Sequence, residues 1–503
     1  MYLSEDFKLV TEGSKYEDPS GILKEGFDRM LAVVRLSHVV SGHRNSSSSG
    51  GSALLEGLHV IISSSTDELE YGADESYKLV VASREKPYAQ LEAKSVYGAL
   101  HGLQTFSQLC HFNMKKKVIE ILMTPWNITD QPRFSYRGLL IDTSRHYLPL
   151  PVMKNVIDSM TYTKLIPSYP KLWNGAYSPT QRYTFEDAAE IVNYAGRRGI
   201  HVLAEIDVPG HALSWGKGYP SLWPSKNCQE PLDVSSDFTF KVIDGILSDF
   251  SKIFKFKFIH LGGDEVNTTC WSTTPRISKW LKKHRKTEAE AYEYFVLRAQ
   301  KLLRHTDMKS STGNLKYPFI GQEKNANQSS FFLVTTFCSN VIYCREETFN
   351  NFGNKLNPKT VVHNWLGTGV VGRVTAAGLR CIMSNQDKWY LDHIDTPWQM
   401  FYANEPFEMI KDEKRQSLVL GGEVCMWGEH IDASDIQQTI WPRAAAAAER
   451  LWTPYTKLAE NPDKVTTRLA HFRCLLNERG VAAAPLVGGG RVAPFEPGSC
   501  LAQ

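Results

Sequence analysis

Long apolar segments are missing from this sequence. The longest apolar runs are well short of the roughly 20 residues that a bilayer-spanning helix needs, so we expect no membrane span. A dominant charge is missing too, because 57 Lys and Arg residues balance 54 Asp and Glu residues and leave a net charge of +3. Such a chain has no broad field for attracting nucleic acid or an anionic membrane. We therefore expect a neutral partner and no nucleic acid.

Cysteine is sparse and scattered. The nine cysteines form no C-x-x-C pair and no Cys/His cluster at zinc spacing, so we expect no metal and no cofactor. The start at Met1-Tyr-Leu-Ser-Glu-Asp lacks the basic and apolar regions of a signal peptide, which predicts either a cytosolic chain or a true start further upstream. Four N-glycosylation sequons would matter only in the secretory route, and they begin at Asn45, Asn127, Asn267 and Asn327.

Two regions with different patterns make up the 503 residues, as expected for a large domain joined to a smaller one. Residues 1–131 predict a small α+β domain, with strands near 58–62, 77–82 and 117–122 and one apolar helical face from Val96 to Cys110. We place the boundary at Gln131-Pro132, because proline disfavours helix in the residue before it.

Short, continuous apolar runs that end in polar residues characterise residues 132–503. Such runs are typical of parallel strands buried on both faces, and they lie at 138–142, 201–207, 258–264, 361–365, 380–384 and 418–423. A (β/α)8 barrel would bring their polar carboxyl ends together. The alternative is a doubly wound open sheet, but no Gly-rich phosphate loop follows the first strand. The pattern favours the barrel.

Two stretches interrupt this pattern. Helical faces at 152–165 and 185–195 are joined only by a polar, Pro-containing loop, which predicts that the second barrel strand is absent. Residues 305–344 have no stable period. So long a connection without structure is uncommon inside a compact domain, and we interpret it as an atypical segment.

The clearest chemical motif is His260-Leu-Gly-Gly-Asp264-Glu265. An apolar strand ends here in two glycines, which allow close approach to the backbone, and then in two adjacent carboxylates. Neighbouring like charges push their pKa values apart, so one group stays anionic while the other holds a proton as a general acid. An isolated Asp-Glu pair is most often a solvated turn, but the strand and glycine context favours a catalytic pair.

Several motifs together resemble the family 20 glycoside hydrolases, the β-N-acetylhexosaminidases of plants and animals. Besides the acid pair, the resemblance rests on Arg137-Gly-Leu-Leu-Ile-Asp-Thr-Ser-Arg145-His146, Glu205-Ile-Asp-Val-Pro-Gly-His211, Trp389-Tyr390-Leu-Asp392, Gly421-Gly-Glu-Val-Cys-Met-Trp427-Gly-Glu429, Trp441-Pro-Arg-Ala and Glu449-Arg-Leu-Trp452. It covers nearly the whole chain, including the small domain before the barrel.

The resemblance implies release of terminal β-linked N-acetylglucosamine or N-acetylgalactosamine from N-glycans or oligosaccharides. In this family the 2-acetamido oxygen of the substrate is the nucleophile. Asp264 would hold the acetamido N–H, and Glu265 would be the general acid and base. The implied sugar-binding residues are Arg145, Trp365, Tyr390, Asp392, Trp427 and Glu429. His211 is interpreted equally well as a structural histidine or as one that orients the acid.

Relatives of this kind are secreted or vacuolar/lysosomal, and a homodimer fits the resemblance. The resemblance also implies disulfides between Cys228 and Cys270 and between Cys474 and Cys500. If the chain stays in the cytosol, these cysteines would instead be free thiols.

Two departures from the family pattern suggest an alternative. Arg345-Glu346-Glu347 stands where the family has Trp-Glu-Glu, and the missing strand would have carried a His-Trp-His and an Asp. The alternative is an impaired or inactive variant, arising from splicing or a gene model, that binds glycans at most.

Two other enzyme classes fit the sequence less well. A diguanylate cyclase shares only Gly262-Gly-Asp-Glu-Val, and a metal-dependent hydrolase would need ligand spacings that the sequence lacks.

Overall fold

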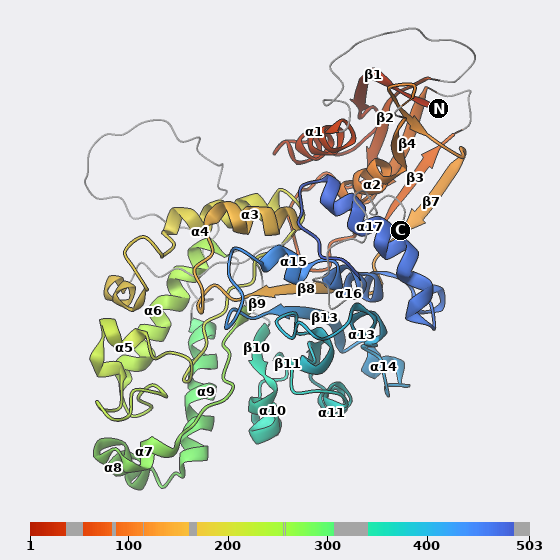
Figure 1. Ribbon diagram of the computed structural model, residues 1–503. Coiled ribbons are helices and arrows are strands. Elements are labelled where there is room, and N and C mark those ends of the chain that lie inside the picture. The colour runs from red at the N-terminus through yellow and green to blue at the C-terminus, as the bar shows by residue number, and fades with distance from the viewer. Residues whose placement is uncertain are drawn as a thin grey trace, which may run out of the picture.

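The computed structural model describes residues 1–36, 54–82, 87–113, 115–159, 169–254, 256, 258–305 and 341–486, without the side chains of 159, 170, 304, 305 and 341–345. Two sheets organise these residues (Figure 1). None of the described helices is long and apolar enough to cross a membrane.

The first sheet has seven strands in the order β5-β6-β1-β2-β4-β3-β7. Helices α1 (Ile22–Val34) and α2 (Val96–Leu109) pack with it around a core that includes Phe7, Phe27 and Phe106. The three predicted strands and the predicted helix are present, and β1, β4, β5, β7 and α1 are additional. The strands are β1 (Tyr2–Val10), β2 (Leu54–Ile62), β3 (Tyr77–Val81), β4 (Tyr88–Ala93), β5 (Cys110–Asn113), β6 (Val118–Ile121) and β7 (Trp126–Asp130).

The second sheet is parallel, and its six strands follow the order β8-β13-β12-β11-β10-β9. They are β8 (Tyr136–Ile141), β9 (Phe258–His260), β10 (Val341–Arg345), β11 (Val361–Asn364), β12 (Arg380–Met383) and β13 (Val419–Met426). The 201–207 run adds a parallel bridge from Glu205 to His260 and so extends the sheet beyond β9. The boundary predicted at 131/132 falls between β7 and β8 and stays a prediction.

Among the described residues, no strand pairs β8 with the 201–207 run, and we call this interruption of the curled sheet the opening. In the described part of this interval there are two helices, α3 (Leu150–Ser159) and α4 (Phe185–Gly196), and a 3-10 helix at Pro170–Gly175, but no strand. The second strand was predicted to be missing from residues 166–184; of these, 169–184 contain the 3-10 helix and no strand, and 166–168 lie outside the described residues. Residues 306–340 of the atypical segment also lie outside the described residues. The last residues of that segment were predicted to be irregular, but they form β10.

A layer of buried polar residues crosses the interior of this sheet. His260 contacts Glu205 at 2.8 Å and His363 at 3.3 Å, and His363 lies 3.5 Å from Glu423. Tyr136 of β8 donates its hydroxyl to Glu423. This chain of contacts therefore connects β8 to the 201–207 run, the two sides of the opening.

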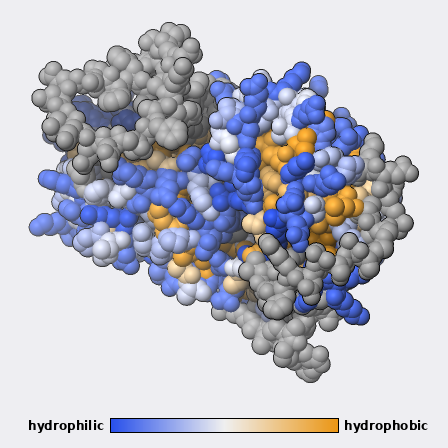
Figure 2. All heavy atoms as spheres, turned by 90° about the horizontal axis from the view of Figure 1, so that it is seen from above, coloured by the Kyte–Doolittle hydropathy of each residue, from blue (hydrophilic) through white to orange (hydrophobic). Residues whose placement is uncertain are grey.

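Helices follow the strands of the second sheet and cover its outer face (Figure 1). The face shown in Figure 2 is mostly hydrophilic, with apolar side chains gathered on the side of the first sheet. The remaining α-helices are α5 (Trp215–Gly218), α6 (Asp237–Ile253), α7 (Thr269–Thr273), α8 (Pro275–His284), α9 (Glu288–His305), α10 (Glu346–Phe352), α11 (Val370–Ala376), α12 (Gln386–Trp389), α13 (Trp398–Ala403), α14 (Glu413–Gln416), α15 (Ile436–Ile440), α16 (Arg443–Trp452) and α17 (Thr466–Glu478).

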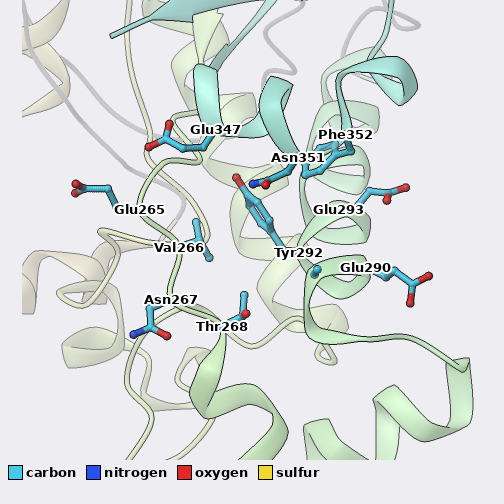
Figure 3. Close-up of a pocket in the computed structure, with 11 residues that line it drawn as sticks. Glu265, Val266, Asn267, Thr268, Glu290, Tyr292, Glu293, Glu347, Asn351 and Phe352 are labelled. Carbon is cyan, nitrogen blue, oxygen red and sulfur yellow. The ribbon is translucent and has the colours of Figure 1, made fainter. Parts of the chain in front are cut away.

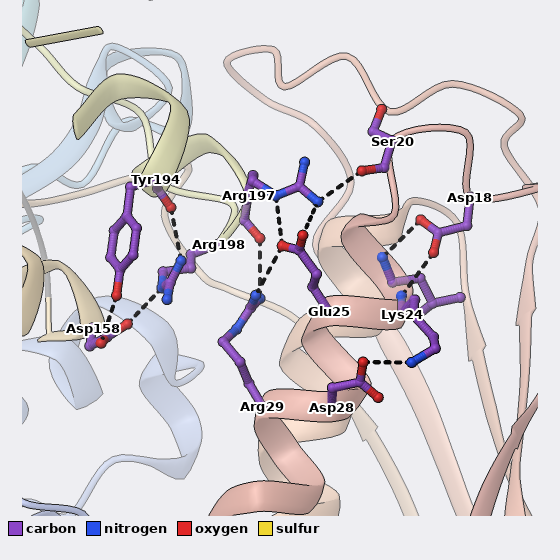
Figure 4. Close-up of polar contacts among 11 residues, drawn as sticks. Asp18, Ser20, Lys24, Glu25, Asp28, Arg29, Asp158, Tyr194, Arg197 and Arg198 are labelled. Atoms are coloured by element: carbon purple, nitrogen blue, oxygen red, sulfur yellow. Dashed lines mark hydrogen bonds and ion pairs between the residues drawn. The ribbon is translucent and has the colours of Figure 1, made fainter. Parts of the chain in front are cut away.

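A cluster of ion pairs joins α1 of the first region to α4 of the second (Figure 4). Arg197 donates from Nε to Glu25 at 2.6 Å and from Nη2 to the Ser20 carbonyl at 2.8 Å. Arg29 donates to the Arg197 carbonyl at 3.2 Å. The next residue, Arg198, also follows the end of α4 and binds Asp158 of α3 at 2.6 Å. These contacts fix α4 beside the opening in the sheet.

Candidate active site

The acid pair lies directly after β9. Asp264 is buried, whereas the Glu265 side chain is 61% exposed. The turn needs left-handed backbone, with φ of 59° at Gly262, 95° at Gly263 and 51° at Glu265. A Cβ on Gly262 would lie 1.9 Å from Asp207 Oδ1, so only glycine fits there. The glycines that the sequence singled out thus place two neighbouring carboxylates in different environments.

A hydrogen-bonded group orients this turn. Asp207 Oδ1 accepts the Gly263 N–H at 2.8 Å, and Asp207 Oδ2 contacts His211 Nδ1 at 2.7 Å. His211 Nε2 lies 3.4 Å from Glu265 Oε2. Burial and the nearby charge of Asp264 raise the pKa of Asp207 to about 7, and the hydrogen bond to Asp207 raises the pKa of His211 to about 9. Of the two interpretations of His211, this geometry favours the orienting one.

Arg145 lies at the carboxyl end of β8. Its guanidinium is 3.1 Å from Asp142 and 3.4 Å from Glu429, and it lies over the Trp427 ring at 5.2 Å. Asp142 also accepts the Gly428 N–H at 3.1 Å, so it joins the ends of β8 and β13. Arginine held at three sides in this way presents a fixed set of donors to a polar ligand.

Three aromatic rings stand together beside Arg145. The Tyr390 ring is 6.4 Å from Trp365 and nearly parallel to it, and 6.2 Å from Trp427. Trp365 donates its indole N–H to Glu347 at 2.8 Å. Tyr390 is buried, and both tryptophans remain partly exposed. Flat apolar faces of this kind suit the apolar face of a sugar ring.

Asp392 follows Tyr390 and is largely buried. Burial raises the pKa of its carboxyl group, and its Oδ1 has no hydrogen-bond partner among the described residues. Glu429 nearby is exposed. A buried acceptor without a partner is costly, so a hydroxyl donor from a ligand would satisfy it.

A cavity of about 630 Å³ opens beside Glu265 (Figure 3). It is lined from the acid turn, from α9 and from α10 by Glu265, Val266, Asn267, Thr268, Ala289, Glu290, Tyr292, Glu293, Glu347, Asn351 and Phe352. Glu347 therefore contacts both this cavity and Trp365 of the aromatic group. The Arg345 side chain, which stands in place of a family tryptophan, lies outside the described side chains.

The sequence identified the residues of the motifs but missed three partners. Asp142 and Asp207 end the first and second apolar runs, and the rule that strand ends converge could have identified both. Glu347 matches the second Glu of the family's Trp-Glu-Glu pattern, but attention to the departure at Arg345 left it without a predicted role.

Two groups of side chains come close enough to hold a metal ion, Asp207 with His211 and Asp264, and His363 with Glu423 and Cys425. In both groups, hydrogen bonds or ion pairs already join some of the candidate ligands to one another. The expectation that no metal is used stays a prediction.

The predicted disulfide between Cys228 and Cys270 is present and ties the loop after His211 to α7. Cys474 is also disulfide-bonded, and its predicted partner Cys500 lies outside the described residues.

Comparison with known families decides the assignment. The catalytic domain of glycosyl hydrolase family 20 matches residues 134–315 and 322–455, and a domain described as beta-acetyl hexosaminidase like matches residues 1–109. The chain belongs to glycosyl hydrolase family 20. The family predicted from the motifs is confirmed, and so is its fold.

The alignments with relatives of this family 20 enzyme include most or all of its residues. Beta-hexosaminidase 3 of Arabidopsis thaliana is 79% identical over 521 aligned positions, which include 100% of this chain and 91% of that protein. The human beta-hexosaminidase subunit beta is 35% identical, over 83% of this chain and 73% of that protein. A chitobiase structure from Flavobacterium johnsoniae superimposes with a TM-score of 0.76 at 25% identity, covering 97% of this chain and 72% of that one.

These relatives agree with the predicted hydrolysis of terminal β-linked N-acetylhexosamine. They give no support to the alternative of an impaired or inactive variant. The alignment with the Arabidopsis protein has 18 positions more than this chain has residues, so that protein carries residues with no counterpart here.

Proposed function

We propose that this enzyme releases terminal β-linked N-acetylglucosamine or N-acetylgalactosamine from N-glycans and other oligosaccharides, with the substrate's acetamido oxygen as the nucleophile. The observation that carries the proposal is the contrast between buried Asp264 and exposed Glu265 on adjacent residues. Two carboxylates in different environments suit two roles. No protein nucleophile is needed when the substrate supplies its own.

In this mechanism Asp264 accepts the acetamido N–H and stabilises the positive oxazolinium that forms. Glu265 protonates the departing glycosidic oxygen and then deprotonates the attacking water. His211, 3.4 Å from Glu265, orients the carboxyl group and is itself held by Asp207. The buried Asp264 acts in a water-poor environment, where its charge is most effective.

The sugar would bind between the aromatic group and the charged residues around it. Tyr390 would donate its hydroxyl to the acetamido carbonyl, while Trp365 and Trp427 would enclose the ring. Asp392 and Glu429 would accept from the sugar hydroxyls and Arg145 would donate to them. The unpartnered Asp392 Oδ1 supports this assignment.

Substitutions of the acid pair test the proposal. Glu265→Gln should reduce turnover of a substrate with a poor leaving group by about 10²- to 10⁴-fold, and a good leaving group should partly restore it. Asp264→Asn should slow both substrates alike, because the acetamido group assists both. Glu288→Gln on α9 is the matched control. A loss below about tenfold on poor leaving groups would remove Glu265 from the role of general acid.

The same assay with EDTA tests the expectation that no metal takes part, and full activity is the expected result.

The Cys228–Cys270 disulfide supports a secreted or vacuolar/lysosomal location, since disulfides persist in oxidising compartments. A homodimer stays a prediction that sedimentation can test.

A further inference from the structure

The acid turn contains a glycosylation sequon. Asn267-Thr268-Thr269 begins two residues after Glu265, and no proline stands in the middle. Two residues of extended chain span at most about 7 Å, so a group attached to Asn267 would lie next to the general acid. Of the four sequons only this one and Asn127-Ile-Thr fall on described residues.

The folded structure leaves room for a glycan at Asn267. Its side chain is exposed, and Figure 3 shows it projecting to the same side of the turn as Glu265. The Asn267 carboxamide oxygen accepts from the Thr269 N–H at 3.1 Å and from the Thr269 hydroxyl at 2.6 Å. Both bonds use the oxygen, so they leave the amide nitrogen, the atom that carries an N-glycan, available.

A second observation concerns the environment in which the chain folds. Cys270, three residues after Asn267, is joined to Cys228. A disulfide of this kind forms where the chain enters the secretory route, and N-glycosylation takes place in the same route. The sequon and the disulfide therefore point to the same compartment.

We infer that Asn267 carries an N-glycan and that this glycan limits the size of the leaving group that can reach Glu265. The Asn267 amide nitrogen forms a bond to the anomeric carbon of an N-acetylglucosamine-terminated oligosaccharide carried on a lipid diphosphate. The bond from that carbon to the diphosphate oxygen breaks, the lipid diphosphate leaves with the electron pair, and the amide nitrogen loses one proton.

The consequence for catalysis rests on the proposed role of Glu265. The leaving group departs past the acid that protonates it, so it must pass the side of the turn on which Asn267 stands. A small aryl group needs little space there. A sugar attached to a folded protein needs much more, and a bulky hydrophilic glycan would compete with it for that space.

The experiment uses the full chain expressed through the secretory route of a eukaryotic host. Mass spectrometry of the peptide that contains Asn267 should show the mass of an attached glycan. Asn267→Gln and Thr269→Ala should both abolish it, whereas Thr269→Ser keeps the sequon and should retain it. An unmodified Asn267 in the wild-type protein would overturn the inference, whatever the activity.

Activity is then compared on an aryl N-acetylglucosaminide and on a glycoprotein with terminal N-acetylglucosamine. In both glycan-free variants the ratio of glycoprotein to aryl turnover should rise by about threefold or more, and Thr269→Ser and Asn127→Gln should leave it unchanged. An unchanged ratio in the glycan-free variants would overturn the size limit, as would an equal rise in Asn127→Gln. The acid-pair variants report separately on the role of Glu265.

Discussion

Among single residues, His211 gives the clearest pH dependence. The hydrogen bond to Asp207 raises its pKa to about 9, above the ordinary value of about 6.5. A histidine with a raised pKa stabilises the folded state fully below pH 6.5, and this stabilisation is lost as the pH rises through about 9. Asp207, with a pKa raised to about 7, completes an ion pair with His211 between about pH 7 and 9.

Substitution of His211 by Gln should therefore lower the melting temperature more at pH 8, where both partners of the ion pair are charged, than at pH 9.5, because glutamine keeps hydrogen bonds but carries no charge. Melting curves of wild type and His211→Gln across this range measure the difference directly. A difference that stays constant with pH would show that the charge of His211 does not contribute.

At the residue scale, the local sequence pattern pointed most directly to the acid pair. Asp264 and Glu265 were predicted because they follow an apolar run that ends in two glycines, whereas Arg145 and Asp392 were predicted from the family motifs, and the roles of all four stay predictions. Glu347 was not assigned a role, since its contact with Trp365 joins α10 to the end of β11, and no local pattern encodes that contact.

Among the elements, α4 depends on its contacts with α1. Arg197 holds Glu25 with two nitrogens, and the hydrogen bond from Arg197 lowers the pKa of the Glu25 carboxyl. Both side chains are partly exposed, so solvent screens the pair, and its loss should cost about 0.2–1 kcal/mol. Arg197→Ala should thus lower the melting temperature slightly at pH 7.

The contribution of the Arg197–Glu25 ion pair to stability depends on pH, and its sign follows from the lowered pKa of Glu25. The contribution is present above the unfolded-state pKa of about 4.3 and is lost as the pH falls through the lower folded-state value. Thermal melting of wild type, Arg197→Ala and the control Arg182→Ala at pH 7 and at pH 3 tests this. An effect of Arg197→Ala that does not shrink in acid would exclude the ion pair as its cause.

Element prediction worked for most of the continuous apolar runs and failed in the segment interpreted as atypical. The runs at 138–142, 361–365 and 380–384 became β8, β11 and β12, because continuous apolar character reports burial on both faces. The 201–207 run makes only a single bridge. β10 was missed although Val341-Ile-Tyr-Cys is itself a short apolar run that ends in a charged residue, because it was included in the segment interpreted as atypical; β9 and β11 pair with it on either side.

At the scale of the whole molecule, the order of the motifs along the chain was more informative than any one of them. Gly262-Gly-Asp-Glu-Val alone also fits a cyclase, and only its place between the Arg145 and Tyr390 motifs separates the two families. The opening between β8 and the 201–207 run is bridged inside the sheet by the layer of Tyr136, Glu423, His363, His260 and Glu205. Sequence could not predict this layer, because its members come from five separate segments.

In the proposed mechanism the substrate supplies the nucleophile while Asp264 and Glu265 assist it. The most direct measurement compares turnover of an aryl N-acetylglucosaminide, its N-trifluoroacetyl analogue and the aryl glucoside that lacks the acetamido group. An internal nucleophile supplies a very large effective concentration, so the glucoside should be slower by about 10³-fold or more. The trifluoroacetyl analogue should fall between the two, because fluorine weakens the attacking oxygen. Turnover of the glucoside within about tenfold of the N-acetylglucosaminide would contradict the account.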